Sequence, residues 1–290
     1  MTARFSLFTT VKDKVVVITG ATSGIGQVAA AKLAGMGARI VFVARDRTRG
    51  EGTLAGLRAQ STASHRVHYA DLSRISEMRR VAEEIASAEP RIDVLMNNAG
   101  AMFSTLQITE DGLERTFALN HMSYFVITRI LRDRVLATPG ARIVNTSSNA
   151  HRNAHVDYDD PQMLKRFRMF KAYCRSKLYN LLFTRELSRQ LQGTGVTANA
   201  LHPGFVATRF GDATSGAGGL VFRILKKFAI TPEQGAETLV HLASSDAVKN
   251  ATGLYFYKCA PTPPTKDALD DAAARWLWTE SERILAAASR

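Results

Sequence analysis

The stretch from Lys14 to Gly26, KVVVITGATSGIG, joins a β-branched apolar run to a glycine-rich turn. Its first part, Val15 to Ile18, is continuously apolar, as is typical of a strand buried on both faces of a parallel sheet. The glycines that follow carry no side chains, so a pyrophosphate can approach the backbone N–H groups at the positive end of a helix predicted over residues 27–36. Glycines also serve ordinary tight turns, and the spacing G-x-x-x-G-x-G differs from the dinucleotide pattern G-x-G-x-x-G. The stretch therefore predicts a strand-turn-helix unit and leaves the ligand of the turn open.

Further apolar runs alternate with helical patterns along the chain. Strands are predicted over residues 38–44, 66–70, 92–96, 142–146, 196–201 and 254–257. Helices are predicted over 73–88, 112–137 and 268–288, with one more that begins at about 48 and another that ends at about 192. Strands that alternate with helices of this length form right-handed parallel crossover units. We therefore predict an α/β protein with a single Rossmann-type domain over residues 1–290. Its doubly wound parallel sheet has about seven strands with helices on both faces, and its site lies outside the carboxyl ends of the strands.

Composition excludes several classes of protein. No segment reaches the roughly 20 apolar residues of a membrane-spanning helix, and the N-terminal residues lack the apolar stretch and cleavage site of a secretory signal. Cys174 and Cys259 cannot build a disulfide framework, which fits a reducing compartment. We therefore expect a cytoplasmic protein. The seven histidines are not interpreted as metal ligands, and no metal is predicted.

The net charge of +12 raises the question of nucleic-acid binding. The positive charge is concentrated between residues 161 and 230, where only Glu186 and Asp212 are acidic. The sequence has no nucleic-acid motif and no stripe of basic residues interleaved with exposed aromatic residues. We therefore predict no nucleic-acid partner and expect the charge to surround the substrate side of the protein.

A second stretch, Tyr173-Cys174-Arg175-Ser176-Lys177, places a tyrosine and a lysine four residues apart on one helix face. Asn97-Asn98-Ala99-Gly100 and the pair Ser147-Ser148 lie upstream, each after a predicted strand. In this order, and together with the glycine turn, these motifs resemble the short-chain dehydrogenase/reductase family over nearly the whole chain. Residues 145–151 and 172–187 and the ending around 253–278 are similar to the retinol dehydrogenase group, to which protochlorophyllide reductases and bacterial ketoreductases are related.

The resemblance implies that Tyr173 donates a proton to a carbonyl oxygen during hydride transfer. A phenol has a pKa near 10, and the ammonium of Lys177 one turn along is expected to lower it. The family also implies that Lys177 grips the nicotinamide ribose, that Ser148 is the second partner of the reacting oxygen, and that Asn120 supports a proton relay through its backbone carbonyl. Ser147 is expected to make a strand-end hydrogen bond instead.

The resemblance also implies which residues hold the cofactor. An acidic residue at the end of the second strand would select NAD through the ribose 2′-hydroxyl. Ala44 and Arg45 stand there, and Arg45 can pair with a 2′-phosphate. We therefore predict NADP(H) over NAD(H), a preference that Asp46 would reverse if the strand were one residue longer. The predicted cofactor-binding residues are Gly20, Thr22, Ser23, Gly24, Ile25, Gly26, Arg45, Asp71, Leu72, Asn98, Ala99, Gly100, Tyr173, Lys177, Pro203, Gly204, Val206 and Thr208.

Some polar positions have two interpretations. Asp71 is implied to contact the adenine edge and is also expected to cap the helix that begins at Ser73. Asn97 is implied to be largely structural, whereas Asn98 is implied to line the adenosine-ribose side. His151 follows the serine pair closely enough to line the pocket.

The sequence thus predicts an NADP(H)-dependent oxidoreductase that interconverts a carbonyl and an alcohol on a small, largely apolar substrate. Two alternatives stay open: a catalytically silent nucleotide-sensing protein of the same fold, and a membrane-surface protein. The second rests on residues 220–228, LVFRILKKF, whose helical pattern sets one apolar face against three cations. This segment lies within a substrate lid predicted over about 205–230, and either covers the pocket or makes a weak, peripheral contact with an anionic membrane. Related proteins suggest a homodimer or homotetramer through the long helices.

Overall fold

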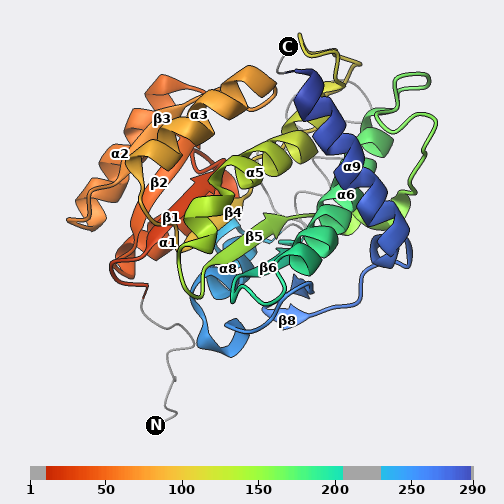
Figure 1. The fold of residues 1–290 in the computed structure, drawn as a ribbon. Helices are drawn as coiled ribbons and strands as arrows, with labels where there is room; N and C mark the ends of the chain where they lie inside the picture. Colours follow the sequence, from red (N-terminus) through yellow and green to blue (C-terminus); the bar gives the residue numbers. More distant parts are fainter. Residues whose placement is uncertain (1–10, 205–229, 289–290) are drawn as a thin grey trace.

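The computed structural model describes residues 11–204 and 230–288 (Figure 1). These residues form an 8-stranded sheet with the order β3-β2-β1-β4-β5-β6-β7-β8. Neighbouring strands are parallel except for β7 and β8. The strands are β1 (Val15–Thr19), β2 (Arg39–Ala44), β3 (Arg66–Tyr69), β4 (Val94–Asn97), β5 (Arg142–Thr146), β6 (Thr197–Leu201), β7 (Tyr255–Tyr257) and β8 (Ala260–Pro261). The predicted doubly wound parallel sheet is confirmed.

Helices cover both faces of this sheet. They are α1 (Gly24–Gly35), α2 (Arg47–Gln60), α3 (Ile75–Ala88), α4 (Arg115–Phe117), α5 (Ser123–Leu136), α6 (Met169–Gln190), α8 (Pro232–Ser244) and α9 (Asp271–Ala287), with short turns η1 (Ala118–Met122), η2 (Asn149–Asn153), η3 (Asp246–Val248) and η4 (Asp267–Leu269). Val16 and Ile18 of β1 pack in one core with α1, α2 and α8, whereas Val15 and Val17 pack in a second core with α3, α5 and α6. Because side chains alternate along a strand, the continuous apolar run supplies both cores.

The structure has one strand beyond the predicted seven. Tyr257 pairs with Ala260 of β8, so the chain reverses over only Lys258 and Cys259. Both residues adopt positive φ angles, 49° and 61°. A two-residue hairpin turn with two positive φ angles usually contains Asn or Gly. Since neither is present, the sequence carries no signal for this hairpin.

The single helix predicted over residues 112–137 is wrong at its start. Gly112 has a φ of 74°, and the Glu114 carboxylate accepts hydrogen bonds from the N–H groups of Thr116 and Phe117, both at 2.8 Å. This cap begins the helix at residue 115. The chain then widens into the π-turn η1, where the Ser123 N–H donates to the Ala118 carbonyl five residues back, before α5 begins. Turns of this kind are frequent at functional sites.

The C-terminal helix α9 crosses over α6 and touches α5 (Figure 1). Trp278 stacks on Phe183 of α6 with ring centroids 5.8 Å apart and meets Phe125 of α5 edge-on at 5.0 Å. Glu282 pairs with Arg129 of α5 at 3.0 Å. Thus α9 occupies part of the surface of the long helices through which assembly was predicted.

Candidate active site

Two glycines of the turn between β1 and α1 are required by close backbone approach. Gly20 has a φ of 72°, and a Cβ at Gly26 would lie 2.2 Å from the Gly20 carbonyl oxygen. Thr22, Ser23, Gly24 and Ile25 complete the turn and the first residues of α1. Within the described chain, Ser23 makes no side-chain cap and α1 has no acidic residue in its first turn. The N–H groups at this positive helix end therefore fit an anionic pyrophosphate.

The Asn98 side chain joins the ends of three neighbouring strands. Its amide donates to the carbonyl oxygens of Thr19 (3.1 Å) and Gly20 (3.2 Å), and its oxygen accepts from the Thr146 hydroxyl (3.3 Å). The Thr19 hydroxyl accepts the backbone N–H groups of Asn98 and Ala99, both at 3.0 Å. Thr19, which the sequence did not single out, thus fixes β4 against the glycine turn.

Asn97 is structural, as predicted. It is fully buried, and its amide donates to Thr128 and to the Asn145 side-chain oxygen, both at 2.9 Å. Asn145 in turn donates to Thr184 of α6 at 2.9 Å. This buried network ties β4, α5, β5 and α6 together below the site.

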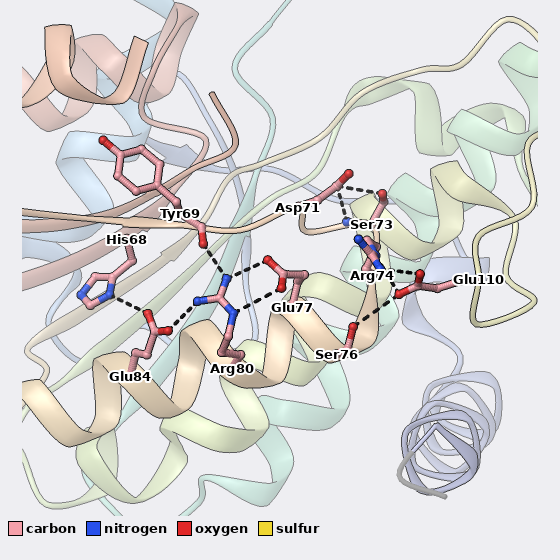
Figure 2. Close-up of polar contacts among 10 residues, drawn as sticks. All are labelled: His68, Tyr69, Asp71, Ser73, Arg74, Ser76, Glu77, Arg80, Glu84 and Glu110. Carbon is pink, nitrogen blue, oxygen red and sulfur yellow. Dashed lines mark hydrogen bonds and ion pairs between the residues drawn. The ribbon is translucent and has the colours of Figure 1, made fainter. Parts of the chain in front are cut away.

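Asp71 follows β3 and closes the turn toward α3 (Figure 2). Its carboxylate accepts hydrogen bonds from the Ser73 N–H at 3.0 Å and the Ser73 hydroxyl at 2.8 Å. The predicted helix cap is partly wrong, because α3 begins at Ile75, whose N–H donates to Asp111 at 2.9 Å. Leu72 next to Asp71 is buried in the core.

The electrostatic surroundings of Asp71 link it to the second strand. Burial opposes ionisation of Asp71, but the Ser73 hydrogen bonds and the guanidinium groups of Arg45 and Arg115 outweigh it and lower the pKa of Asp71. The carboxylate is therefore ionised near pH 7. Arg45 and Asp71, predicted as contacts on the adenosine side, lie within electrostatic range of each other.

Polar contacts connect α3 to β3 and to the loop that carries Glu110, as Figure 2 shows. Arg80 donates to the Tyr69 carbonyl of β3 at 2.7 Å and pairs with Glu77 and Glu84 of its own helix. At the start of α3, Arg74 pairs with Glu110 at 2.5 Å. Exposed pairs of this kind contribute little to stability, so their effect here is to orient the helix that follows Asp71.

The end of β2 matches the predicted register. β2 ends at Ala44, and Arg45 is exposed just beyond it. The Asp46 carboxylate caps α2 by accepting the Arg49 N–H at 2.8 Å. Asp46 is thus engaged in capping α2, which leaves Arg45 as the residue at the strand end.

Ser148, Tyr173 and Lys177 come together between β5 and α6. The side chains of Ser148 and Tyr173 are hydrogen-bonded. The Lys177 Nζ lies 5.7 Å from the Tyr173 ring and donates to the Thr146 carbonyl oxygen at 3.0 Å. Lys177 is only 3% exposed. These contacts bring three of the four predicted catalytic side chains to one place.

The fourth, Asn120, lies in the π-turn η1. Its amide donates to the Ala101 carbonyl and to the Ser176 hydroxyl, both at 2.9 Å, and its oxygen accepts the Ala101 N–H at 2.9 Å. A Cβ at Gly100 would lie 3.2 Å from the Asn120 oxygen and 3.3 Å from the Lys177 Nζ. Because Gly100 has no side chain, a space remains that is bordered by the Asn120 oxygen and the Lys177 Nζ.

The expected effect of Lys177 on Tyr173 is wrong in this structure. Burial raises the pKa of Tyr173 to about 12, although the Ser148 hydrogen bond works in the other direction. Burial also lowers the pKa of Lys177 to about 7, so its charge is only partly present at neutral pH. Depth of burial, which sequence spacing does not reveal, decides both values. Tyr173 is therefore a protonated phenol, the form that can act as an acid.

The carbonyl of Thr146 collects several donors that sequence reasoning missed. Besides Lys177, it accepts from the Asn180 amide at 3.1 Å and the Tyr124 hydroxyl at 3.3 Å. The prediction for Ser147 is confirmed, because its hydroxyl donates to the Lys177 carbonyl at 2.7 Å. The end of β5 is thereby fixed to α6. Asn180 follows Lys177 by three residues on α6, which is the signal that helical spacing offered.

The last predicted cofactor turn is only partly described. Pro203 and Gly204 follow β6, and Gly204 has a φ of 90° that favours glycine. His202 before them is buried and stacks on Tyr257 at 4.2 Å, and burial lowers its pKa to about 4. The other predicted features of this region lie outside the described residues. They are Val206, Thr208, the basic segment 220–228 and, up to residue 229, the lid predicted over about 205–230.

The described ranges hold neither a cluster of metal ligands nor a membrane-spanning helix. Residues 11–204 and 230–288 contain no group of three or more His, Cys, Asp or Glu side chains that could hold a metal ion. No helix in these ranges has the length and apolar character needed to span a bilayer.

Comparisons with known proteins agree with this geometry. A family profile described as short chain dehydrogenase matches residues 14–217. Retinol dehydrogenase 13 of Homo sapiens is 38% identical over 287 residues, which cover 95% of this chain and 86% of that protein. An uncharacterized protein from Mycobacterium paratuberculosis has a similar structure, with a TM-score of 0.77 and 30% identity over 96% of this chain and 95% of that chain. RhlG of Pseudomonas aeruginosa, solved as a complex with NADP, has a TM-score of 0.69 and 25% identity over 87% and 97% of the two chains.

Proposed function

Because this chain belongs to the short-chain dehydrogenase family and to its retinol dehydrogenase-like group, we propose that it is an NADP(H)-dependent oxidoreductase. It interconverts a carbonyl and an alcohol on a largely apolar substrate, with Tyr173 as the proton donor and acceptor. The observation that carries the proposal is that Ser148, Tyr173 and Lys177 come together at the end of β5. A nucleotide-sensing protein would not require this set of hydroxyl, phenol and amine.

The residues at the glycine turn fit a dinucleotide. A side chain at Gly26 would collide with the Gly20 carbonyl, so the backbone is bare where a pyrophosphate would approach. At the end of β2, Arg45 would face the ribose, and a guanidinium pairs with a 2′-phosphate. Asp46, the residue that would favour a 2′-hydroxyl, caps α2 instead. This arrangement favours NADP(H) over NAD(H), in keeping with the NADP found in the complex of RhlG.

Reduction of a carbonyl needs a proton at oxygen as well as a hydride at carbon. A reduced nicotinamide, when bound at the glycine turn, would supply the hydride. The Tyr173 phenol, protonated because burial raises its pKa to about 12, supplies the proton. Ser148 is hydrogen-bonded to Tyr173 and can donate its hydroxyl to the same substrate oxygen. In the oxidation direction the alcohol proton returns to Tyr173.

After it has given up its proton, Tyr173 regains one through Lys177 and the residues beside Lys177. With a pKa of about 7, Lys177 can both hold and release a proton at neutral pH. Asn120 and Lys177 both border the space at Gly100, and Asn120 lies in the π-turn η1. A π-turn shifts the helix hydrogen bonds by one residue, which supports the relay through the Asn120 carbonyl. Asn120 is itself held by Ser176, whose hydroxyl donates to the Tyr173 carbonyl at 2.8 Å.

The substrate class is inferred from the relatives and from the rim of the site. The relatives are named for retinol, an apolar alcohol. Phe170, one turn before Tyr173 on α6, is 50% exposed. Apolar residues exposed beside a site mark the surface that an apolar ligand contacts. We infer that the substrate is a largely apolar carbonyl or alcohol.

The test is NADPH oxidation by the purified protein against retinal and polycyclic, terpenoid and aryl carbonyls, with the alcohol product identified by chromatography. We expect turnover of at least one apolar carbonyl, faster with NADPH than with NADH. Tight NADPH binding without hydride transfer to any member of the panel would reject the enzyme and favour the nucleotide-sensing alternative.

A further inference from the structure

The turn that begins at Ser148 is hydrogen-bonded to a segment far away in the sequence. We call residues 262–267, from the end of β8 to the first residue of η4, the C-terminal strap. The strap contacts the turn η2 at two places and the chain just beyond it at a third. The Thr265 N–H donates to the His151 Nε2 at 3.4 Å, and Arg152 donates to the Pro263 carbonyl at 2.9 Å. Just beyond η2, His155 pairs with Asp267 at 2.5 Å.

Of the three residues that contact the strap, His151, Arg152 and His155, only His151 has a described side-chain contact with the backbone of Ser148. Its Nδ1 lies 2.7 Å from the Ser148 carbonyl oxygen. A carbonyl oxygen can only accept, so Nδ1 must carry the proton and donate. The Thr265 N–H can only donate, so Nε2 must be the bare acceptor. Both contacts select the same neutral tautomer.

The surroundings of His151 keep the imidazole neutral and fixed. The residue is fully buried, and burial lowers its pKa despite the hydrogen bond to the Ser148 carbonyl. Tyr255 of β7 packs edge-on against the ring with centroids 5.2 Å apart. All the contacts of the buried ring are with groups of the protein, including the Tyr255 hydroxyl at 3.5 Å from Nδ1. Its contacts therefore serve orientation.

We propose that His151 is a positioning residue that holds Ser148 within hydrogen-bonding reach of Tyr173, with the C-terminal strap holding the imidazole in the required tautomer. The inference rests on the proposed function, since it gives Ser148 its role. The Ser148 hydroxyl accepts the Ala150 N–H at 3.1 Å, so the serine is fixed both through its side chain and, by His151, through its carbonyl. Accurate placement matters because small displacements of catalytic groups cost large factors in rate.

Three substitutions separate the two contacts of the imidazole. His151→Asn keeps a donor two bonds from Cβ, where Nδ1 stands, and loses the reach to Thr265. His151→Gln keeps an acceptor three bonds from Cβ, near the position of Nε2, and loses the donor to Ser148. His151→Phe keeps the ring and loses both. We expect kcat to fall about tenfold in the Phe and Gln variants and about threefold or less in the Asn variant.

A double-mutant cycle distinguishes positioning from general loss of stability. If His151 acts through Ser148, the tenfold loss caused by His151→Phe should shrink below about twofold in a Ser148→Ala background. The KM and the NADPH affinity, measured by fluorescence, should stay within about twofold of wild type. His65→Phe is the matched control. His65 is also buried and accepts the Ile40 N–H at 3.0 Å, but it precedes β3 at the opposite edge of the sheet from β7 and β8.

Hydrogen exchange provides a readout independent of turnover. Amides of residues 148–153 should exchange faster in His151→Phe than in wild type, and those in His65→Phe should not. If the Phe variant does not fold, the Asn and Gln pair carries the same comparison. A tenfold loss that persists in the Ser148→Ala background, or a kcat within twofold of wild type in both Phe and Gln variants, would overturn the positioning role. Full activity of Ser148→Ala would overturn the catalytic role of Ser148 and with it the positioning role of His151, whereas a wild type that binds NADPH without hydride transfer to any carbonyl of the panel would overturn the proposed function itself.

Discussion

Lys177→Met should make the protein more stable while removing its activity. Lys177 is a nearly fully buried amine whose pKa falls to about 7, against an ordinary value of 10.5. Holding a proton at this site therefore costs free energy, which the folded protein bears at neutral and acidic pH. Methionine has a similar length and no charge, so it fills the same space without that cost.

The magnitude follows from the two pKa values. A difference of about 3.5 corresponds to about 5 kcal/mol of folding free energy below pH 7, at 1.36 kcal/mol for each pH unit. Losing the hydrogen bond to the Thr146 carbonyl returns about 1 kcal/mol. That carbonyl still accepts from Asn180 and Tyr124, so it is not left unpaired. We expect a net gain of about 3 to 4 kcal/mol at pH 6, which is about 6 °C in melting temperature for a chain of this size.

The sign of the pH dependence is fixed by linkage. Between pH 7 and about 10.4 the unfolded lysine binds more protons than the folded one, so the wild type gains stability as pH rises. The advantage of Lys177→Met is therefore largest below pH 7 and disappears near pH 10. Thermal unfolding without added cofactor from pH 6 to pH 10 measures it. Lys171→Met, which changes an exposed lysine on the same helix, should show a small, pH-independent shift.

Two results would refute this reasoning. The first is a lower melting temperature of Lys177→Met at pH 6, which would mean that Lys177 stabilises the fold as a charge. The second is a stability difference that does not change with pH, which would mean that packing and not ionisation separates the two proteins.

Arg45→Ala should weaken NADPH binding about tenfold or more and leave NADH binding nearly unchanged, because a charge-assisted hydrogen bond contributes about 1.5–3 kcal/mol; equal affinity of the wild type for both cofactors, measured by fluorescence titration, would contradict this. Gly26→Ala should lower the melting temperature by several degrees, because the added Cβ meets the Gly20 oxygen at 2.2 Å and overpacking costs about 1–3 kcal/mol. Gly52→Ala, where the added atom meets nothing within 4 Å, should not; equal melting temperatures would show that the turn yields. Replacing Arg223, Lys226 and Lys227 by Gln should preserve activity on soluble carbonyls. If the wild type pellets with anionic liposomes at low salt and the triple variant does not, these three cations contact the membrane; if the wild type stays in the supernatant, they do not.

Local sequence signals predicted the fold because they are strong where the sheet is built. The run Val15 to Ile18 is apolar throughout and is buried on both faces of the sheet. In the turn after it, side chains at Gly20 and Gly26 would collide with neighbouring backbone atoms. The four-residue spacing of Tyr173 and Lys177 needs only a helix to bring both to one face. These features depend on neighbours in sequence, and the structure agrees with them.

Features that depend on distant contacts were not predictable in the same way. The hairpin at Lys258 and Cys259 uses positive φ angles without the usual residues. The π-turn around Asn120 interrupts a helical pattern that looked continuous. The pKa of Tyr173 depends on how deeply the ring is buried, and the role of His151 depends on a strap more than a hundred residues away.

The most direct test of the central claim compares Tyr173→Phe with wild type in NADPH binding and in carbonyl reduction. Tyr179→Phe, which removes another hydroxyl from α6, is the control. We predict that Tyr173→Phe binds NADPH within a few-fold of wild type and that its rate of reduction falls about 10²–10⁴-fold, whereas Tyr179→Phe retains most of the activity. Reduction by Tyr173→Phe at a rate near that of the wild type would show that another group supplies the proton.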